Sequence, residues 1–269
     1  MMRTLLICLA LTMLIYFSEA ITAQSAPPSN VAISASPTAL PTAYDIISIR
    51  PHEEDNSRTG SYWRQTPAGF SANVPVRSLI MTAYHLIMLD QIVGLATWGE
   101  SDTFDIEAKL DPANADAVAK LHGDDRIKEN ADLMKALLAD RFKMKAHTEV
   151  KDLPVYTLVI AKNGSKLKVA PANQPTGFGM GMGTINSKGM PIASLAASLS
   201  HPAGRLILDK TGLTSNYEVN LTWAWNDDPT STSPSLFSAL QDQLGLKLEP
   251  AKAPVDVVVI DHLERPSEN

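Results

Sequence analysis

The chain has 269 residues and a formal net charge of −6, from 23 Lys and Arg against 29 Asp and Glu. No basic block interrupts this acidic balance, so nucleic acids and anionic membrane surfaces are unfavourable partners. The single cysteine, Cys8, lies near the N-terminus. Cleavage of that end would leave no cysteine, which excludes disulfides, Cys-ligated zinc, iron–sulfur clusters and a thiol nucleophile.

Residues 1–23 have the pattern of a secretory signal peptide. A short basic region precedes an apolar run from Leu5 to Phe17, and small residues follow it. The run is shorter than the ~20 residues that a membrane span requires, so an uncleaved anchor is the second alternative. We expect an exported protein, periplasmic or extracellular, without a membrane span after cleavage. Residues 24–43, rich in Ser, Ala and Pro, predict a flexible lead-in.

The first regular elements are expected between residues 74 and 110. Pro75 fits the start of a helix, where no N–H donor is needed. Apolar residues then recur at helical spacing, and these are Leu79, Ile80, Ala83, Leu86 and Ile87. Residues 104–110, FDIEAKL, alternate apolar and charged side chains, which predicts a strand with one buried face.

Two stretches of the chain are nearly the same, PVYTLVIAK at residues 154–162 and PVDVVVIDH at residues 254–262. Both are rich in β-branched residues, which predicts strands in the middle of a sheet. Further segments match in the same order, namely helix patterns from Leu133 and Leu236, residues 74–84 with 190–200, and residues 104–110 with 217–223. Elements that recur in one order indicate an internal duplication.

The repeated unit reads as β-α-β-β-α-β-β, without the strict alternation of a doubly wound sheet. We therefore expect an α+β fold with helices packed on mainly antiparallel sheets. Copy one covers residues 44–162 and copy two covers residues 183–265. Residues 163–182 between them are expected to form a connector. The pattern leaves open whether the copies are separate domains or share one sheet. Ser235 is the expected N-cap of the helix in copy two.

Several phrases of the chain carry a family resemblance: YDIISIRP, FDIEAKL, LLADRFKMKAH, LPVYTLVIAK, LDKTGLTSNYEVNLTW and the C-terminal stretch that begins at LFSALQDQLG. Together they resemble an uncharacterised secreted family from soil bacteria, expanded into many paralogues in acidobacteria. The resemblance implies a domain of unknown function. Some members carry it after a membrane-embedded metallopeptidase module like those of antibiotic-sensing receptors, which implies a sensory or interaction role outside the cytoplasm. The chain departs from the pattern at Ser215–Asn216, where members usually have Gly before the aromatic residue.

Three short strings match the motifs of the penicillin-recognising serine enzymes. They are Ser71-Ala72-Asn73, Ser165-Lys166-Leu167-Lys168 and Lys210-Thr211-Gly212. Their order is wrong, and Ser165 lies in a polar stretch where the nucleophile should begin a buried helix. The alternative for residues 209–213, DKTGL, is a tight turn in which Asp209 bonds to the turn backbone and Gly212 takes a positive φ. We favour the turn.

Histidines are the other candidates for metal or general-base chemistry. No H-E-x-x-H motif is present, and the dense His/carboxylate clusters at residues 52–55 and 122–125 lie in loop-like sequence. A zinc site needs three or four converging ligands, so we expect no metal and no cofactor. His85 and His201 fall at similar places in the two copies, which favours structural positions at helix ends.

Candidate binding residues are the tryptophans Trp98, Trp223 and Trp225 and the turn residues Asp209, Lys210 and Thr211. Aromatic residues on one sheet face bind glycans or peptides, although core packing is the commoner role. Residues 177–183, GFGMGMG, lack the spacing of a phosphate-binding loop and are interpreted as a mobile connector.

The leading hypothesis is an exported, non-enzymatic binding or interaction module without a cofactor, whose partner is an envelope protein or a small ligand. Strand addition at a sheet edge suits a duplicated scaffold of this kind. The alternative is an extracytoplasmic hydrolase-type enzyme whose residues converge only in the fold.

Overall fold

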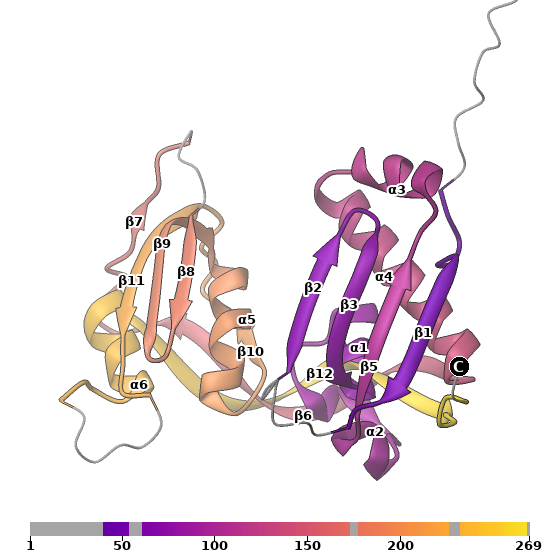
Figure 1. Ribbon diagram of the computed structural model, residues 1–269. Coiled ribbons are helices and arrows are strands. Elements are labelled where there is room, and N and C mark those ends of the chain that lie inside the picture. The colour runs from indigo at the N-terminus through magenta and orange to yellow at the C-terminus, as the bar shows by residue number, and fades with distance from the viewer. Residues whose placement is uncertain (1–39, 54–60, 173–176, 226–231, 268–269) are drawn as a thin grey trace, which may run out of the picture. The chain divides into compact units, whose positions relative to one another are not determined.

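The computed structural model describes residues 40–53, 61–172, 177–225 and 232–267. The expected signal peptide and nearly all of the lead-in lie outside them. The described residues contain three four-stranded sheets, which we call A, B and C (Figure 1). Sheet A is wholly antiparallel, with strand order β1 (Ile46–Pro51), β5 (Thr103–Lys109), β3 (Gly69–Pro75) and β2 (Tyr62–Thr66).

Helices cover one face of sheet A (Figure 1). They are α1 (Val76–Ala83) and α4 (Gly123–Arg141), while α2 (Thr97–Ser101) and α3 (Pro112–Ala119) lie near opposite ends of the sheet and the 3-10 turn η1 (Leu89–Gln91) follows α1 in the chain. The helix expected to follow Pro75 in the sequence is α1. It ends at Ala83, before Leu86 and Ile87 of the predicted pattern, because His85 takes a φ of 54° and turns the chain. The acidic cluster expected as a loop after His122 is instead the first turn of α4, where carboxylates favour the helix dipole.

Sheet C is also antiparallel and has strand order β7 (Lys168–Val169), β11 (Asn216–Thr222), β9 (Thr184–Pro191) and β8 (Phe178–Gly181). Its helices are α5 (Ile192–Ala203), α6 (Leu236–Ala239) and the π-helical turn η2 (Leu240–Leu244). Two strands, β7 and β8, lie in residues 163–182, which were interpreted as a connector. Phe178–Gly181 of the GFGMGMG stretch pair with β9 as strand β8, so the interpretation as a mobile connector was wrong for these residues.

Sheet B joins strands from both predicted copies. Its order is β10 (Ile207–Asp209), β6 (Lys145–Ile160), β12 (Leu246–His262) and β4 (Ile92–Val93). The long strands β6 and β12 pair antiparallel, while β10 runs parallel to β6 and β4 parallel to β12. Residues 44–162 and 183–265 therefore share this sheet.

The repeated unit was expected to end in two strands, but each half ends in one long strand. Pro154 and Pro254 lie inside β6 and β12, at positions where neither β10 nor β4 pairs with them. Proline lacks an N–H donor and is tolerated where one side of a strand has no neighbour. Pro154 and Pro254 are therefore compatible with a continuous two-stranded ribbon.

The long strands contribute to two apolar cores. Val258 and Ile260, near the end of β12, pack with sheet A, α1 and α4. Leu158, near the end of β6, packs with Leu246 and Leu248 of β12 against sheet C, α5 and α6. Helices thus pack on mainly antiparallel sheets, and the predicted α+β fold class is confirmed.

Several local predictions are confirmed as well. In β5, Phe104, Ile106 and Ala108 are buried while Glu107 and Lys109 are exposed. The hydroxyl of Ser235 accepts a hydrogen bond from the backbone N–H of Ser238, as an N-cap does.

Candidate functional site

The edge strand β8 carries exposed apolar side chains. It is the last strand of sheet C and lies beside α5 (Figure 1). Phe178 is 52% exposed, Met180 is 44% exposed, and Met182 in the following turn is 80% exposed. Apolar residues on an unpaired edge are a template for another strand, and proteins usually protect such edges.

The β8 backbone has donors and acceptors to offer at this edge. The N–H of Lys188 donates to the carbonyl of Gly177, and residues along an antiparallel strand alternate between bonded and non-bonded positions. Phe178 and Met180 therefore direct their N–H and C=O groups away from β9. Their side chains face the same side of the sheet as Ser187 and Ile185, which are buried.

A groove lies between this edge and α5. We call it the β8–α5 groove; it encloses about 330 Å³ and is lined by Phe178, Ser187, Gly189, Met190, Pro191, Ser194 and Ser198. None of these residues is charged, and α5 itself, IASLAASLSHPA, contains no Asp, Glu, Lys or Arg. The hydroxyl of Ser187 accepts from the N–H of Gly189, and that of Ser198 donates to the carbonyl of Ser194. The groove is therefore small, uncharged and weakly polar.

Two turns hold β8 and α5 in place. The β8–β9 hairpin closes at Gly183, whose φ is 76° and where a Cβ would meet the carbonyl oxygen of Trp223. Helix α5 begins after Pro191 in extended conformation and ends at Gly204 in the left-handed region. Both glycines suit positions that disfavour other residues.

The edge of sheet A is built differently, although sheets A and C have the same pattern of strand order. Gln65 in β2 faces Phe70, as Met180 in β8 faces Ile185. Trp63 covers the core at that edge, because its ring stacks on Phe70 with centroids 5.0 Å apart and planes 7° apart. Charged and polar residues fill the rest of β2, YWRQT, which is a usual protection of an edge strand.

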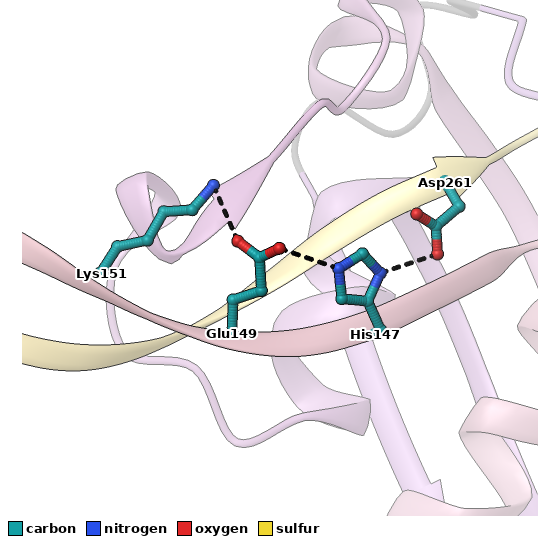
Figure 2. Close-up of polar contacts among 4 residues, drawn as sticks. All are labelled: His147, Glu149, Lys151 and Asp261. Carbon is teal, nitrogen blue, oxygen red and sulfur yellow. Dashed lines mark hydrogen bonds and ion pairs between the residues drawn. The ribbon is translucent and has the colours of Figure 1, made fainter.

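A charged network lies on the β6–β12 ribbon. Figure 2 shows His147 between two carboxylates: Nδ1 lies 2.9 Å from Oδ2 of Asp261, and Nε2 lies 3.1 Å from Oε1 of Glu149. Lys151 extends the network, with its Nζ 3.2 Å from Oε2 of Glu149. Each of these side chains is between 40% and 48% exposed.

The network shifts the pKa of its members. Hydrogen bonds to Asp261 and then to Glu149 raise the pKa of His147. Hydrogen bonds from His147 and then Lys151 hold the pKa of Glu149 below its ordinary value. Only the imidazolium has two N–H donors for two carboxylates. Both ring nitrogens of His147 therefore face carboxylates that link the two strands, and neither nitrogen contacts a hydroxyl group in the described residues.

A second histidine cluster lies at the open face of sheet A. The Nδ1 atom of His52 lies 3.0 Å from Oδ2 of Asp105 and 2.6 Å from Nδ2 of Asn73, and Asn73 also donates to Oδ1 of Asp105 at 2.8 Å. Among the described residues, the partners of His52 and of His147 include no Ser or Thr hydroxyl. Neither cluster has the nucleophile–base contact that serine-type hydrolysis requires.

The tryptophans singled out in the sequence belong to the cores. Trp98 lies in α2, edge-to-face with Phe104, and the guanidinium of Arg265 lies 5.0 Å from its ring centroid. Trp223 is 4% exposed and lies just beyond β11, where it contacts the partly buried Trp225. The structure brings Trp223 and Trp225 together, and places Trp98 in the other core.

The DKTGL stretch forms the turn that its sequence predicts. The N–H and hydroxyl of Thr211 both donate to Oδ1 of Asp209, and Gly212 has a φ of 72°. The backbone N–H of Lys210 donates to Leu158, beside the end of β6. None of these three candidates lines the β8–α5 groove. Ser165 lies in a loop, as expected, and its hydroxyl accepts from the N–H of Leu167.

The β8 edge was missed by the sequence interpretation. Its signal is the alternation in FGMGM, where large apolar residues occupy every second position, as in a half-buried strand. Four glycines in seven residues obscured that signal, since glycine is typical of loops.

In the described ranges, no group of three or more His, Cys, Asp or Glu side chains could hold a metal ion. Within the same ranges, no helix has the length and apolarity that a membrane crossing would need. The histidines singled out at helix ends lie there: His85 follows the C-cap of α1, and His201 is in the last turn of α5.

Comparison with known proteins gives one family. The family model described as "Protein of unknown function (DUF3738)" matches residues 77–263, from the first turn of α1 to the residue after β12. No curated protein and no solved structure matches the chain.

Proposed function

The chain belongs to the DUF3738 family of proteins of unknown function, and we propose that it is an exported binding protein that holds an extended, uncharged segment of a partner protein. The observation that supports this most is the β8 edge, where Phe178 and Met180 are exposed beside an uncharged groove. Export is supported by the signal-peptide pattern of residues 1–23.

The mode of binding that fits this edge is strand addition. A partner strand placed antiparallel to β8 would bond to the outward N–H and C=O groups of Phe178 and Met180, which provides affinity without reading a side chain. Every second partner side chain would then point into the β8–α5 groove. Methionine adapts to varied shapes, so Met180 and Met190 suit an occupant with several acceptable side chains.

The absence of charge from the groove restricts the occupant. Burial of an unpaired Asp, Glu, Lys or Arg against Phe178 and Met190 would cost several kcal/mol, on the order of a thousandfold in affinity. Ser194 and Ser198 offer hydroxyls for small polar groups at the rim. The preferred segment is therefore extended and carries small or apolar residues at alternate positions.

A hydrolase, the alternative from the sequence, requires a base with a free nitrogen next to a nucleophile. His147 has carboxylates at both nitrogens, and His52 is bonded to Asn73 and Asp105. These contacts favour binding over hydrolysis.

We also propose that the two halves arose by duplication. The strand order β1-β5-β3-β2 corresponds to β7-β11-β9-β8, with α1 after β3 as α5 follows β9. In this proposal the first copy keeps a protected edge, while the second keeps an open one for binding.

Selection from a display library of random 12-residue peptides tests the function. We expect the selected peptides to be uncharged in the segment that binds, and to protect amides of β8 in hydrogen-exchange mass spectrometry. Met180→Lys adds a charge to the β8 edge, where the partner strand would pair, and should reduce their affinity at least tenfold. Gln65→Lys is the matched control, because Gln65 has the equivalent place at the edge of sheet A. Protection elsewhere, or equal affinity in both variants, would refute the proposal.

A further inference from the structure

A second hollow lies on the face of sheet C that is turned away from its core. It encloses about 750 Å³ and is lined by Gly177, Phe178, Asn186, Ser187, Lys188, Glu218 and Asn220. In β11, Glu218 and Asn220 alternate with the buried Val219 and Leu221, so they point to the open face. This volume is within the range of small-molecule sites.

The polar side chains of this hollow are not engaged with one another. Among the described residues, the side chains of Asn186, Lys188, Glu218 and Asn220 make no hydrogen bond or ion pair. Their donors and acceptors are open to a ligand. Asn186 and Asn220 lie directly opposite each other on β9 and β11, so two amides are adjacent on one surface.

On the corresponding face of sheet A, several charged side chains pair with one another. Asp105 bonds to His52 and Asn73, and Glu107 pairs with Lys109 at 2.7 Å. Since the two sheets have the same strand arrangement, the difference is in the side chains. The open face of sheet C carries both hydrogen-bond donors and acceptors on paired strands. Among the described residues, these side-chain groups have no partner.

We propose that the open face of sheet C binds a neutral, polyhydroxylated ligand of the oligosaccharide class. A primary amide both donates and accepts, so the pair Asn186 and Asn220 matches neighbouring hydroxyls, which also do both. Lys188 and Glu218 contribute opposite charges that cancel, so the site has no preference for an anion or a cation.

This site is separate from the strand-addition edge. Phe178 and Ser187 border both hollows, whereas Asn186, Lys188, Glu218 and Asn220 line only the open face, and Met190, Ser194 and Ser198 line only the groove. Variants on each side therefore distinguish the two functions.

The test is an NMR titration of the full-length exported form of the protein with cellohexaose, chitohexaose and laminarihexaose, each neutral. We expect at least one to shift the side-chain amide signals of Asn186 and Asn220. The Asn186→Ala and Asn220→Ala variants should each weaken that binding roughly two- to tenfold, as loss of one or two hydrogen bonds does. The double variant should bind more weakly than either.

Two controls make the result decisive. Gln65→Ala removes an exposed amide from the edge of sheet A and should leave the affinity unchanged. Met180→Lys, which adds a charge to the β8 edge, should leave sugar binding intact even if it abolishes peptide binding. Hexagalacturonate, an anionic sugar of the same length, should bind no better than the neutral ones. The proposal is wrong if none of the neutral hexaoses shifts the two amides, or if the asparagine variants bind as well as the unmodified protein.

Discussion

The Nδ1 atom of His147 lies 2.9 Å from the Oδ2 atom of Asp261, a residue 114 positions further along the chain (Figure 2). The contact depends on an irregularity in the β6–β12 pairing, where the register shifts between Ile260 and His262. An extra residue in one strand redirects its side chain. Asp261 is that residue, and it contacts His147 across the ribbon.

Replacement of Asp261 by Asn should lower the pKa of His147. The hydrogen bond to Asp261 is the largest cause of the raised pKa, and an amide oxygen attracts an imidazolium less than a carboxylate does. A ¹H–¹⁵N NMR titration of the imidazole measures this directly. Glu264→Gln is the control, because Glu264 pairs with His262 and not with His147. An unchanged pKa of His147 in Asp261→Asn would contradict the assignment.

The network of His147, Glu149 and Asp261 should also make the folding stability of the protein depend on pH. The pKa of His147 is raised in the folded protein, so its contribution is fully present below the unfolded value of about 6.5 and is lost as pH rises through the folded pKa. Glu149 has the opposite sign, since its pKa is lowered. Its contribution is present above its unfolded pKa and is lost as pH falls through the folded one. Urea unfolding of His147→Gln at pH 5 and pH 9 should show a loss of stability at pH 5 only.

Replacement of Glu129 by Gln should stabilise the protein at neutral pH. Glu129 is 8% exposed, and its Oε1 has no hydrogen-bond partner in the described structure. Burial, and then the charge of Asp132, raise its pKa. The folded state therefore holds this proton more tightly, and stability falls as pH rises from the ordinary pKa of 4.5 through the folded one. Removal of the charge should increase stability by about 1 kcal/mol at pH 7.

Thermal unfolding at pH 4 and pH 7 checks the Glu129 prediction, with the advantage of the variant expected to disappear at the lower pH. A second measurement is the ultraviolet titration of Tyr44. Its pKa is raised to about 12, first by burial and then by the charge of Glu129. That pKa should fall in Glu129→Gln. Glu100→Gln, an exposed carboxylate in α2, is the control. A variant less stable than the parent at pH 7 would show that Glu129 has a partner in solution.

Replacement of Gly245 by Ala should destabilise the protein more than replacement of Gly204. Both glycines end helices with positive φ, 66° and 70°, so both variants incur backbone strain of about 1 kcal/mol. A Cβ at Gly245 would also collide with the carbonyl oxygen of Gly164, whereas a Cβ at Gly204 meets nothing within 4 Å. We expect a loss of about 1–3 kcal/mol more at Gly245. Urea denaturation measures the free energy of unfolding of both variants. Equal losses would mean that the loop at Gly164 moves aside at little cost in free energy.

Replacement of Ser200 by Ala should cost about 1–3 kcal/mol of stability. Ser200 is fully buried in α5, and its hydroxyl donates to the carbonyl of Ala196 and accepts from the N–H of Ile207, both at 2.9 Å. Alanine would leave that N–H at the start of β10 without its acceptor. Ser198→Ala is the matched control, because the half-buried Ser198 also donates one turn back but, among the described residues, accepts no such bond. Chemical denaturation should show little change in the control. A similar small change in Ser200→Ala would show that water replaces the hydroxyl.

The sequence by itself determined the elements whose physics is local. Alternation in residues 104–110 specified β5, Ser235 specified a helix start, and Asp209 with Gly212 specified a turn. Each depends on the preferences of residues within a few positions of one another, and those preferences act in the unfolded chain as well. The α+β fold class followed from the order of these elements.

Only the tertiary structure decided which strands pair and which edges remain open. Nothing local places His147 beside Asp261, because that contact needs the antiparallel register of β6 and β12. Pro154 and Pro254 fit inside long strands because neither β10 nor β4 pairs at their positions. Likewise β8 is a strand because β9 lies beside it, since pairing supplies hydrogen bonds that a glycine-rich segment cannot satisfy alone. Such choices arise from competition among all possible pairings of the chain, in which burial of the two cores outweighs local preference.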